Sequence, residues 1–157
     1  MTLAAQVVAA AMAKGVMITT AESCTGGLVS AALTDIVGSS VMFQYGFVTY
    51  SNAAKVAMVQ VDPATLDAFG AVSEQVAEQM ARGARQCAIA DISVSITGIA
   101  GPGGSDHKPE GRVCFGIDVG GDVRTITHEF GSLGRSQVRA CSVQTALTML
   151  QCALDSF

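Results

Sequence analysis

The sequence has few of the residues that hold metal ions or covalent cross-links. Its two histidines lie far apart, at positions 107 and 128, and its five cysteines form no C-x-x-C pair. An odd number of dispersed cysteines fits neither a disulfide framework nor a zinc site. We therefore expect no metal and no other cofactor.

Charge is also scarce. Only 14% of the 157 residues are charged, against 50% that are hydrophobic, and the formal net charge is −4. The lysines and arginines are scattered, apart from Arg135 and Arg139, whereas a nucleic-acid interface needs a clustered basic face. We expect no nucleic-acid partner, and the apolar composition suggests a homo-oligomer.

Long hydrophobic runs are missing too. No apolar run reaches the roughly 18–20 residues that cross a bilayer. The first fourteen residues have an amphipathic helical pattern and lack the basic start of a signal peptide. These absences predict a cytoplasmic protein without a membrane partner.

The length and the residue patterns predict one α/β domain covering residues 1–157. Helices between the first three strands imply parallel crossovers, and a closing hairpin implies one antiparallel strand. We predict a three-layer α/β/α sandwich on a mixed five-stranded sheet, with residues 19–27, 50–55 and 97–105 meeting at one edge. Strands are expected at 16–20, 43–50, 91–96, 113–119 and 123–130, and helices at 3–14, 28–36, 53–59, 63–69, 73–88 and from about 134.

The stretch MITTAESCTGG (17–27) predicts a strand, a tight polar turn and the start of a helix. Open α/β sheets bind ligands at such strand ends, and a helix amino terminus favours an anion or a developing oxyanion. Ser23 and Cys24 are two candidate nucleophiles in the turn. Cys24 ranks second, because no histidine is placed to serve it and apolar packing explains a small buried thiol.

Lys55 is the candidate base. If Asn52 is the N-cap of the following helix, Lys55 is the third helical residue, where the helix dipole disfavours a cation. The dipole and burial would both lower its pKa, as a lysine general base requires. A Ser23–Lys55 dyad is one interpretation, and a solvated lysine on an alanine-rich helix is the other.

Two neighbours of this pair have open roles. Tyr50 either donates to a substrate or orients Lys55, or it is a strand-end aromatic with a satisfied hydroxyl. Glu22 either binds a polar group of the substrate or stabilises the helix that follows it.

A second group of candidates lies in the glycine-rich segment TGIAGPGGSDHKPEG (97–111) and at the start of the last helix. The segment offers hydroxyls and N–H groups for an oxyanion or a phosphate, although it contains no Walker motif. Arg135 and Arg139 share one helical face and could clamp a phosphate or carboxylate. His107 and Asp106 would complete a Ser–His–Asp triad only if this exposed loop reached Ser23.

Four long motifs resemble the carboxyl-terminal domain of the competence-damage-inducible protein CinA, the nicotinamide-nucleotide amidase family. They are TAESCTGGLVSAALTDIVGSS (20–40), GFVTYSNAAK (46–55), GAVSEQVAEQMARGAR (70–85) and SITGIAGPGGSDHKPEG (95–111). The chain departs from the family pattern at Leu133-Gly134-Arg135, where G-D-R is usual, and at Glu110, where valine is usual. We expect the Glu110 departure to lie away from the chemistry.

The resemblance implies hydrolysis of nicotinamide mononucleotide to nicotinate mononucleotide and ammonia. It implies Ser23 as nucleophile, Lys55 as base and Tyr50 as a further catalytic residue. A nucleotide-binding regulatory module linked to competence is the alternative from another class, and an esterase or amidase of another small substrate is a third. The expected substrate contacts are Glu22, Thr25, Gly26, Gly27, Asn52, Thr97, Gly98, Gly101, Gly103, Ser105, Arg135 and Arg139.

Overall fold

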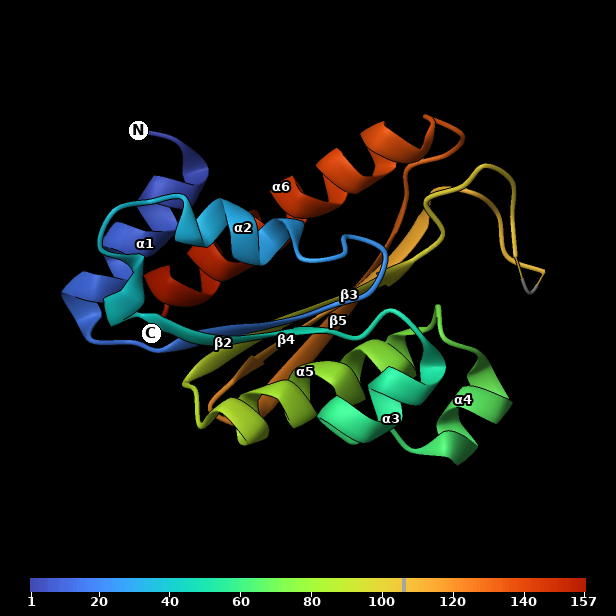
Figure 1. Cartoon of the computed structure of the whole chain (residues 1–157), viewed down its shortest axis with the longest axis horizontal. Coiled ribbons are helices and arrows are strands. Elements are labelled where there is room, and N and C mark those ends of the chain that lie inside the picture. The colour runs from blue at the N-terminus through green and yellow to red at the C-terminus, as the bar shows by residue number, and fades with distance from the viewer. Residues whose placement is uncertain (106) are drawn as a thin grey trace.

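A five-stranded sheet runs through the middle of the molecule, with helices on both of its faces (Figure 1). The computed structural model describes residues 1–105 and 107–157. The elements are α1 (Leu3–Lys14), β1 (Ile18–Glu22), α2 (Leu28–Thr34), the 3₁₀ helix η1 (Ser39–Val41), β2 (Phe43–Val48), α3 (Asn52–Val59), α4 (Pro63–Phe69), α5 (Glu74–Ala88), β3 (Ile92–Gly98), β4 (Arg112–Val119), β5 (Asp122–Glu129) and α6 (Arg135–Asp155).

The strand order is β2-β1-β3-β4-β5, and the direction of each strand confirms the predicted mixed sheet. β1 pairs in parallel with both β2 and β3, whereas β4 is antiparallel to its neighbours β3 and β5. One strand, β4, therefore opposes the other four. The carboxyl ends of β1, β2 and β3 share one edge, because parallel strands end on the same side of a sheet.

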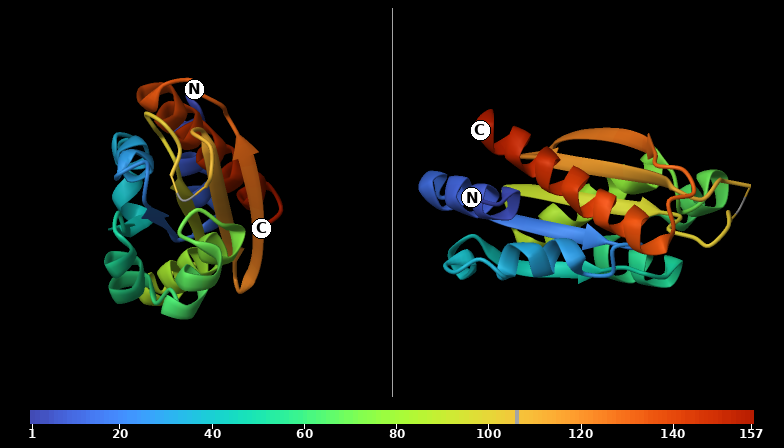
Figure 2. Two further views of the ribbon diagram at one scale, coloured as in Figure 1. Left: turned by 90° about the vertical axis from the view of Figure 1, so that its right-hand side faces the viewer. Right: turned by 90° about the horizontal axis from the view of Figure 1, so that it is seen from above.

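The helices divide into two layers, which Figure 2 shows from the side and from above. α1, α2 and α6 cover one face and enclose the larger apolar cluster, which includes Val7, Ile18 and Leu147. α3, α4 and α5 cover the other face over a smaller cluster that includes Ala21 and Met80. The predicted three-layer α/β/α sandwich is confirmed.

Local capping signals fix most helix ends where the sequence predicts them. The Thr2 side chain accepts the N–H of Ala5, and Gly15 ends α1 in the left-handed region. The Ser73 side chain caps α5 by accepting the N–H of Val76, and Pro63 opens α4. These ends follow from sequence because a cap or a proline acts within one turn of its own position.

Two of the boundaries that differ from prediction affect the residues considered for the site. The N-cap of α3 is Ser51, whose side chain accepts the N–H of Ala54, so Lys55 is the fourth residue of the helix rather than the third. β1 continues to Glu22, two residues beyond the predicted end. Glu22 therefore belongs to the buried sheet and not to the turn.

α3 is held close to α5 by a glycine. A Cβ added at Gly83 would lie 1.7 Å from the carbonyl oxygen of Val59, the last residue of α3. Only glycine permits this approach of the two helices. The contact fixes the helix that carries Lys55.

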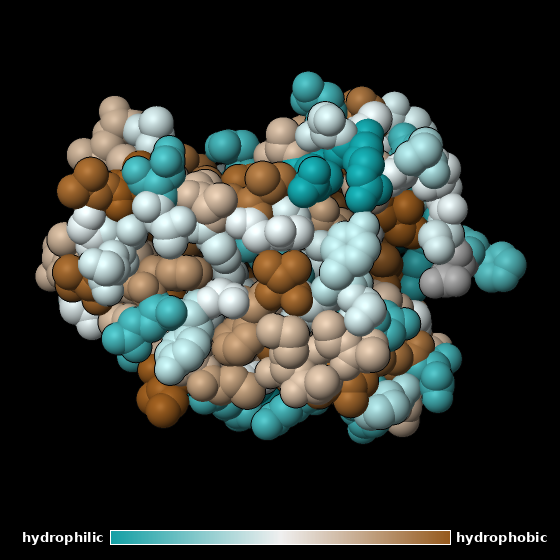
Figure 3. Space-filling model, viewed as in Figure 1, coloured by the Kyte–Doolittle hydropathy of each residue, from teal (hydrophilic) through white to brown (hydrophobic). Residues whose placement is uncertain are grey.

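Figure 3 shows the molecule from the side of the edge strand β2, and the middle of this face is mainly white to brown. Residues 36–54, which include β2, carry no charged side chain. Tyr45, Val48 and Tyr50, in and next to this strand, are each about half exposed.

In the part of the chain that the structure describes, no helix is long and apolar enough to span a membrane.

Candidate active site

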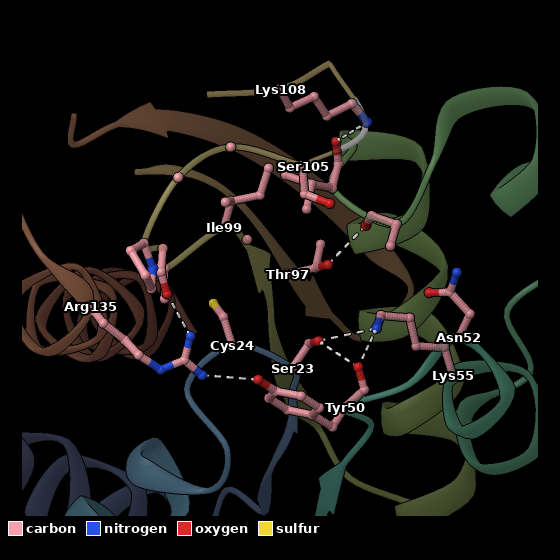
Figure 4. Close-up of a pocket in the computed structure, with 18 residues that line it drawn as sticks. Ser23, Cys24, Tyr50, Asn52, Lys55, Thr97, Ile99, Ser105, Lys108 and Arg135 are labelled. Carbon is pink, nitrogen blue, oxygen red and sulfur yellow. Dashed lines mark hydrogen bonds between the residues drawn. The ribbon is translucent and has the colours of Figure 1, made fainter. Parts of the chain in front are cut away.

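A cavity of about 330 Å³ lies at the carboxyl edge of the parallel strands. The turn after β1, the start of α3 and the segment after β3 line it, as the topology predicts. α6 contributes Arg135 at its first position. Figure 4 shows the lining side chains.

Ser23 and Lys55 face each other at the base of this cavity (Figure 4). The Lys55 Nζ atom lies 3.1 Å from the Ser23 Oγ atom. The N–H of Ser23 donates to the carbonyl of Ile96 on β3, which fixes the backbone that carries the hydroxyl. The two side chains that the sequence pairs are thus in hydrogen-bond contact, 32 residues apart in the chain.

The surroundings of Lys55 favour its neutral form. The side chain is 1% exposed, and burial lowers the pKa of Lys55 from the ordinary lysine value of 10.5 to about 8. Its Nζ atom also donates to the carbonyl oxygens of Thr49, at 3.1 Å, and Tyr50, at 3.3 Å. In the structure Nζ donates to Ser23 Oγ as well, and the Ser23 hydroxyl donates to the carbonyl of Tyr50 at 3.3 Å. When Lys55 is neutral, its amine keeps two hydrogens for the carbonyls and has one lone pair that can take the hydroxyl proton.

Cys24 also lines the cavity, but its environment opposes a thiolate. The residue is 7% exposed, and burial raises the pKa of the Cys24 thiol to about 12. Reactive cysteines need the opposite shift. The packing interpretation of Cys24 fits the structure better than the nucleophile interpretation.

The start of α2 does not offer the open anion site that the turn suggested. Glu22 is fully buried, and its carboxylate accepts the N–H groups of Val29 and Ser30 at 2.9 and 3.0 Å. The hydroxyls of Thr25 and Ser30 donate to the same carboxylate, at 2.7 and 2.8 Å. The protein's own carboxylate therefore occupies this helix terminus, as the structural interpretation of Glu22 predicts.

The expected substrate contacts around this turn need correction for the same reason. Glu22, Thr25, Gly26 and Gly27 do not line the cavity. The N–H of Gly26 donates to the Ser23 carbonyl oxygen, 3.0 Å away. These residues build the turn that holds Ser23.

The two arginines of α6 take different places. Arg135 lines the cavity, where it donates to the hydroxyl of Tyr50 at 3.0 Å and to the carbonyl of Gly101 at 2.8 Å (Figure 4). Arg139 donates to the carbonyls of Cys24 and Thr25 behind the turn. The two guanidiniums therefore do not form the predicted clamp. Arg135 lies on the cavity, and Arg139 supports the turn at its base.

The glycine-rich segment forms the far wall of the cavity. Its expected contacts Thr97, Gly98, Gly101, Gly103 and Ser105 all line the cavity. Asn52 of α3 lines it as well.

Glu110 contacts this wall without lining the cavity. Its carboxylate accepts the N–H of Gly103 at 2.6 Å. The N–H groups of Gly26 and Gly103 therefore both donate hydrogen bonds to acceptors within the protein. The glycine turns consequently offer fewer N–H groups to an oxyanion or a phosphate than their sequence suggests.

The glycine-rich segment also holds His107, which the sequence made a candidate, and Lys108, which it did not. His107 is exposed and does not line the cavity, and Asp106 of the considered triad lies outside the described residues. Lys108 does line the cavity, and no periodicity or capping pattern around it indicates this position. Among the described residues, no group of three or more histidine, cysteine, aspartate or glutamate side chains could hold a metal ion.

Fold and site together define a three-layer α/β/α protein with a buried serine–lysine pair at the carboxyl edge of its sheet. The chain belongs to the CinA C-terminal domain family, whose sequence profile matches residues 1–154. The match confirms the family indicated by the four motifs.

Three relatives illustrate this membership. The chain is 50% identical over 156 residues to the nicotinamide-nucleotide amidohydrolase PncC of Enterobacter agglomerans, which covers 99% of this chain and 93% of the relative. It is 61% identical over 101 residues to a CinA-like protein of Chlorobaculum tepidum, covering 64% of this chain but only 24% of that protein. The crystal structure of the competence/damage-inducible protein CihA from Agrobacterium tumefaciens superposes with a TM-score of 0.93 at 47% identity, covering 98% of this chain and 93% of that one.

Proposed function

We propose that this protein is an amidohydrolase that converts nicotinamide mononucleotide to nicotinate mononucleotide and ammonia with a Ser23–Lys55 dyad. The observation that carries the proposal is the buried lysine with a lowered pKa, 3.1 Å from a serine hydroxyl on a cavity. A serine hydroxyl is a weak nucleophile that needs an adjacent base. The near full-length similarity to a nicotinamide-nucleotide amidohydrolase supports the substrate.

The reaction starts with neutral Lys55. Its amine takes the proton of the Ser23 hydroxyl while Oγ attacks the carboxamide carbon, forming a tetrahedral intermediate with a negative oxygen. Backbone N–H groups at the cavity would stabilise this oxygen. Protonated Lys55 then gives its proton to the departing nitrogen, and ammonia leaves an acyl ester on Ser23.

The second half of the reaction reverses these roles. Water enters where ammonia left and gives a proton to Lys55 as its oxygen attacks the ester carbon. Collapse of the second intermediate returns the proton to Ser23 Oγ and releases the carboxylic acid, which gives its remaining proton to the solvent and becomes the carboxylate. Lys55 ends neutral, so the dyad is ready for another turnover.

Arg135 is the proposed ligand of the substrate's phosphate. Its guanidinium lines the cavity and is held by Tyr50 and Gly101, so it presents a positioned cation. Arg139 does not compete for this role, because its donors are directed to backbone carbonyls behind the turn.

The test is ammonia release by the purified chain supplied with nicotinamide mononucleotide. The proposal expects one ammonia and one nicotinate mononucleotide for each substrate consumed, measured by a coupled ammonia assay and by anion-exchange chromatography. Calorimetric binding of the nucleotide without ammonia release would instead establish a non-catalytic binding module. Ammonia release from other small amides but not from the nucleotide would contradict the assigned substrate.

A further inference from the structure

The segment 69–72, which joins α4 to α5, has an unusual hydrogen-bond pattern. Each of its four carbonyls accepts a side-chain donor. Gly70 accepts from Ser73 at 2.9 Å and Ala71 from Thr97 at 2.8 Å, while Phe69 and Val72 accept from Lys108 at 2.7 and 2.5 Å. Ala71 and Val72 line the cavity, so these donors fix one of its walls.

Lys108 joins this wall to the glycine-rich segment opposite. Its backbone pairs with Ser105 in both directions, at 3.0 and 2.8 Å, which ties it to the end of the stretch 101–105 that lines the cavity. Its side chain then crosses to residues 69–72, where the ammonium also meets the carboxyl end of α4, the favourable end for a cation. Lys108 thus joins two walls that lie more than 30 residues apart in the chain, and it makes two of the three side-chain hydrogen bonds between them, the third being that of Thr97.

The position of the ammonium indicates a role in holding the walls rather than in the chemistry. Figure 4 shows it on the opposite side of the cavity from the Ser23–Lys55 pair. Two of its three N–H groups are donated to carbonyls, whereas the dyad is held independently by the carbonyls of Thr49 and Tyr50. Loss of the Lys108 side chain would thus leave the dyad in place and release the walls.

We propose that Lys108 is a positioning residue that holds segment 69–72 and the glycine-rich loop at the separation required to bind the substrate. This inference rests on the proposed amidase function for its kinetic readout. Since the walls contact the substrate and the dyad performs the reaction, Lys108 acts on KM and not on kcat.

The test compares Lys108→Met with a matched control, Lys14→Met. Lys14 forms the same kind of clasp, donating to the carbonyls of Leu154 and Phe157 at 2.6 and 3.3 Å, and it does not line the cavity. We expect Lys108→Met to raise KM for nicotinamide mononucleotide about tenfold, with kcat within about threefold of wild type. Lys14→Met should leave both constants unchanged.

A conservative variant separates the loss of the positioning hydrogen bonds from general damage to the fold. Lys108→Arg keeps donors for two carbonyls and should recover most of the lost affinity. An unchanged KM in Lys108→Met, an equal KM rise in Lys14→Met, or a fall confined to kcat would each overturn the positioning role.

Amide hydrogen exchange keeps this inference separate from the proposed function. Lys108→Met should exchange faster than wild type in both segment 69–72 and loop 101–105, whereas Lys14→Met should not. If the wild type releases no ammonia, the proposed function fails and the exchange comparison alone decides the role of Lys108. Unchanged exchange in either segment would show that Lys108 does not join the two walls.

Discussion

The two sides of β1 each hold one fully buried charged side chain, and the two differ in what surrounds them. On the side of α2, the Glu22 carboxylate accepts four hydrogen bonds, all from the turn and helix that follow it. From the side of α3, the Lys55 amine meets two carbonyls and the hydroxyl of Ser23 at the base of a cavity.

This difference separates a structural charge from a functional one. Glu22 is saturated by donors that do not change during a reaction, so its charge organises the turn. Lys55 has an acceptor set that suits either protonation state, and burial lowers its pKa towards neutrality. A buried charge indicates chemistry when one of its partners is reactive and accessible.

Of the changes that compare the two buried charges, removing the Lys55 amine should have the largest effect. Lys55→Met is expected to lower kcat about 10³-fold, because a general base typically contributes 10²–10⁴-fold. The wild-type kcat/KM should rise about tenfold per pH unit below about pH 8 and level off above it, since only neutral Lys55 is a base. A pH–rate profile on ammonia release checks both, and a profile that is flat from pH 6 to 9 would contradict the role of Lys55.

Glu22→Gln should affect stability more than catalysis. The variant places an amide where only acceptors fit and loses charge-assisted bonds to the start of α2, at a cost of about 3 kcal/mol. This corresponds to a fall in Tm of about 6–12 °C. Calorimetry measures the fall in Tm. The kcat measured well below Tm should stay within about threefold of wild type. A loss of kcat as large as that of Lys55→Met would remove the distinction between the two buried charges.

The Lys55→Met variant should be more stable than wild type at neutral pH. Below about pH 8, Lys55 is charged in the folded and unfolded states, and its burial disfavours the folded one. Between about pH 8 and 10.5 the folded state has lost this proton while the unfolded chain keeps it, so wild-type stability gains with rising pH. We expect Lys55→Met to raise Tm by about 2–4 °C at pH 7, with a gain that shrinks towards pH 10.5.

A different result would contradict the predicted stability of Lys55→Met. A Tm below wild type at pH 7, together with a difference that does not change with pH, would mean that Lys55 is held as a stabilising cation. The urea midpoint of both proteins at pH 7 and pH 10 provides an independent check.

Cys24→Ala should have the smallest effect. Because burial raises the pKa of this thiol to about 12, almost no thiolate exists at neutral pH, and kcat should stay within about twofold of wild type. Iodoacetamide should leave Cys24 unmodified at pH 7.5, as peptide mass spectrometry would show. A large loss of activity would return the thiol as a candidate nucleophile.

The fold and the meeting of Ser23 with Lys55 could be predicted from sequence, because both depend on short-range patterns. Periodicity gave the strands and helices, and parallel crossovers brought the strand ends to one edge. The contact between the two residues required only that β1 and β2 be neighbours, since Lys55 lies in the helix directly after β2.

The roles of Glu22, Arg139 and Lys108 could not be predicted in the same way. Each depends on which backbone groups lie within reach of a long side chain after folding. Glu22 could serve the helix or the cavity until the direction of its carboxylate was known, and the clasp of Lys108 joins segments that carry no sequence signal for one another.

Ammonia release from nicotinamide mononucleotide by Ser23→Ala tests the central claim most directly. The dyad predicts a fall in kcat of about 10⁴-fold or more, with the protein still folded and still binding the nucleotide. Activity within tenfold of wild type would show that the Ser23 hydroxyl is not the nucleophile, and the proposed mechanism would be wrong.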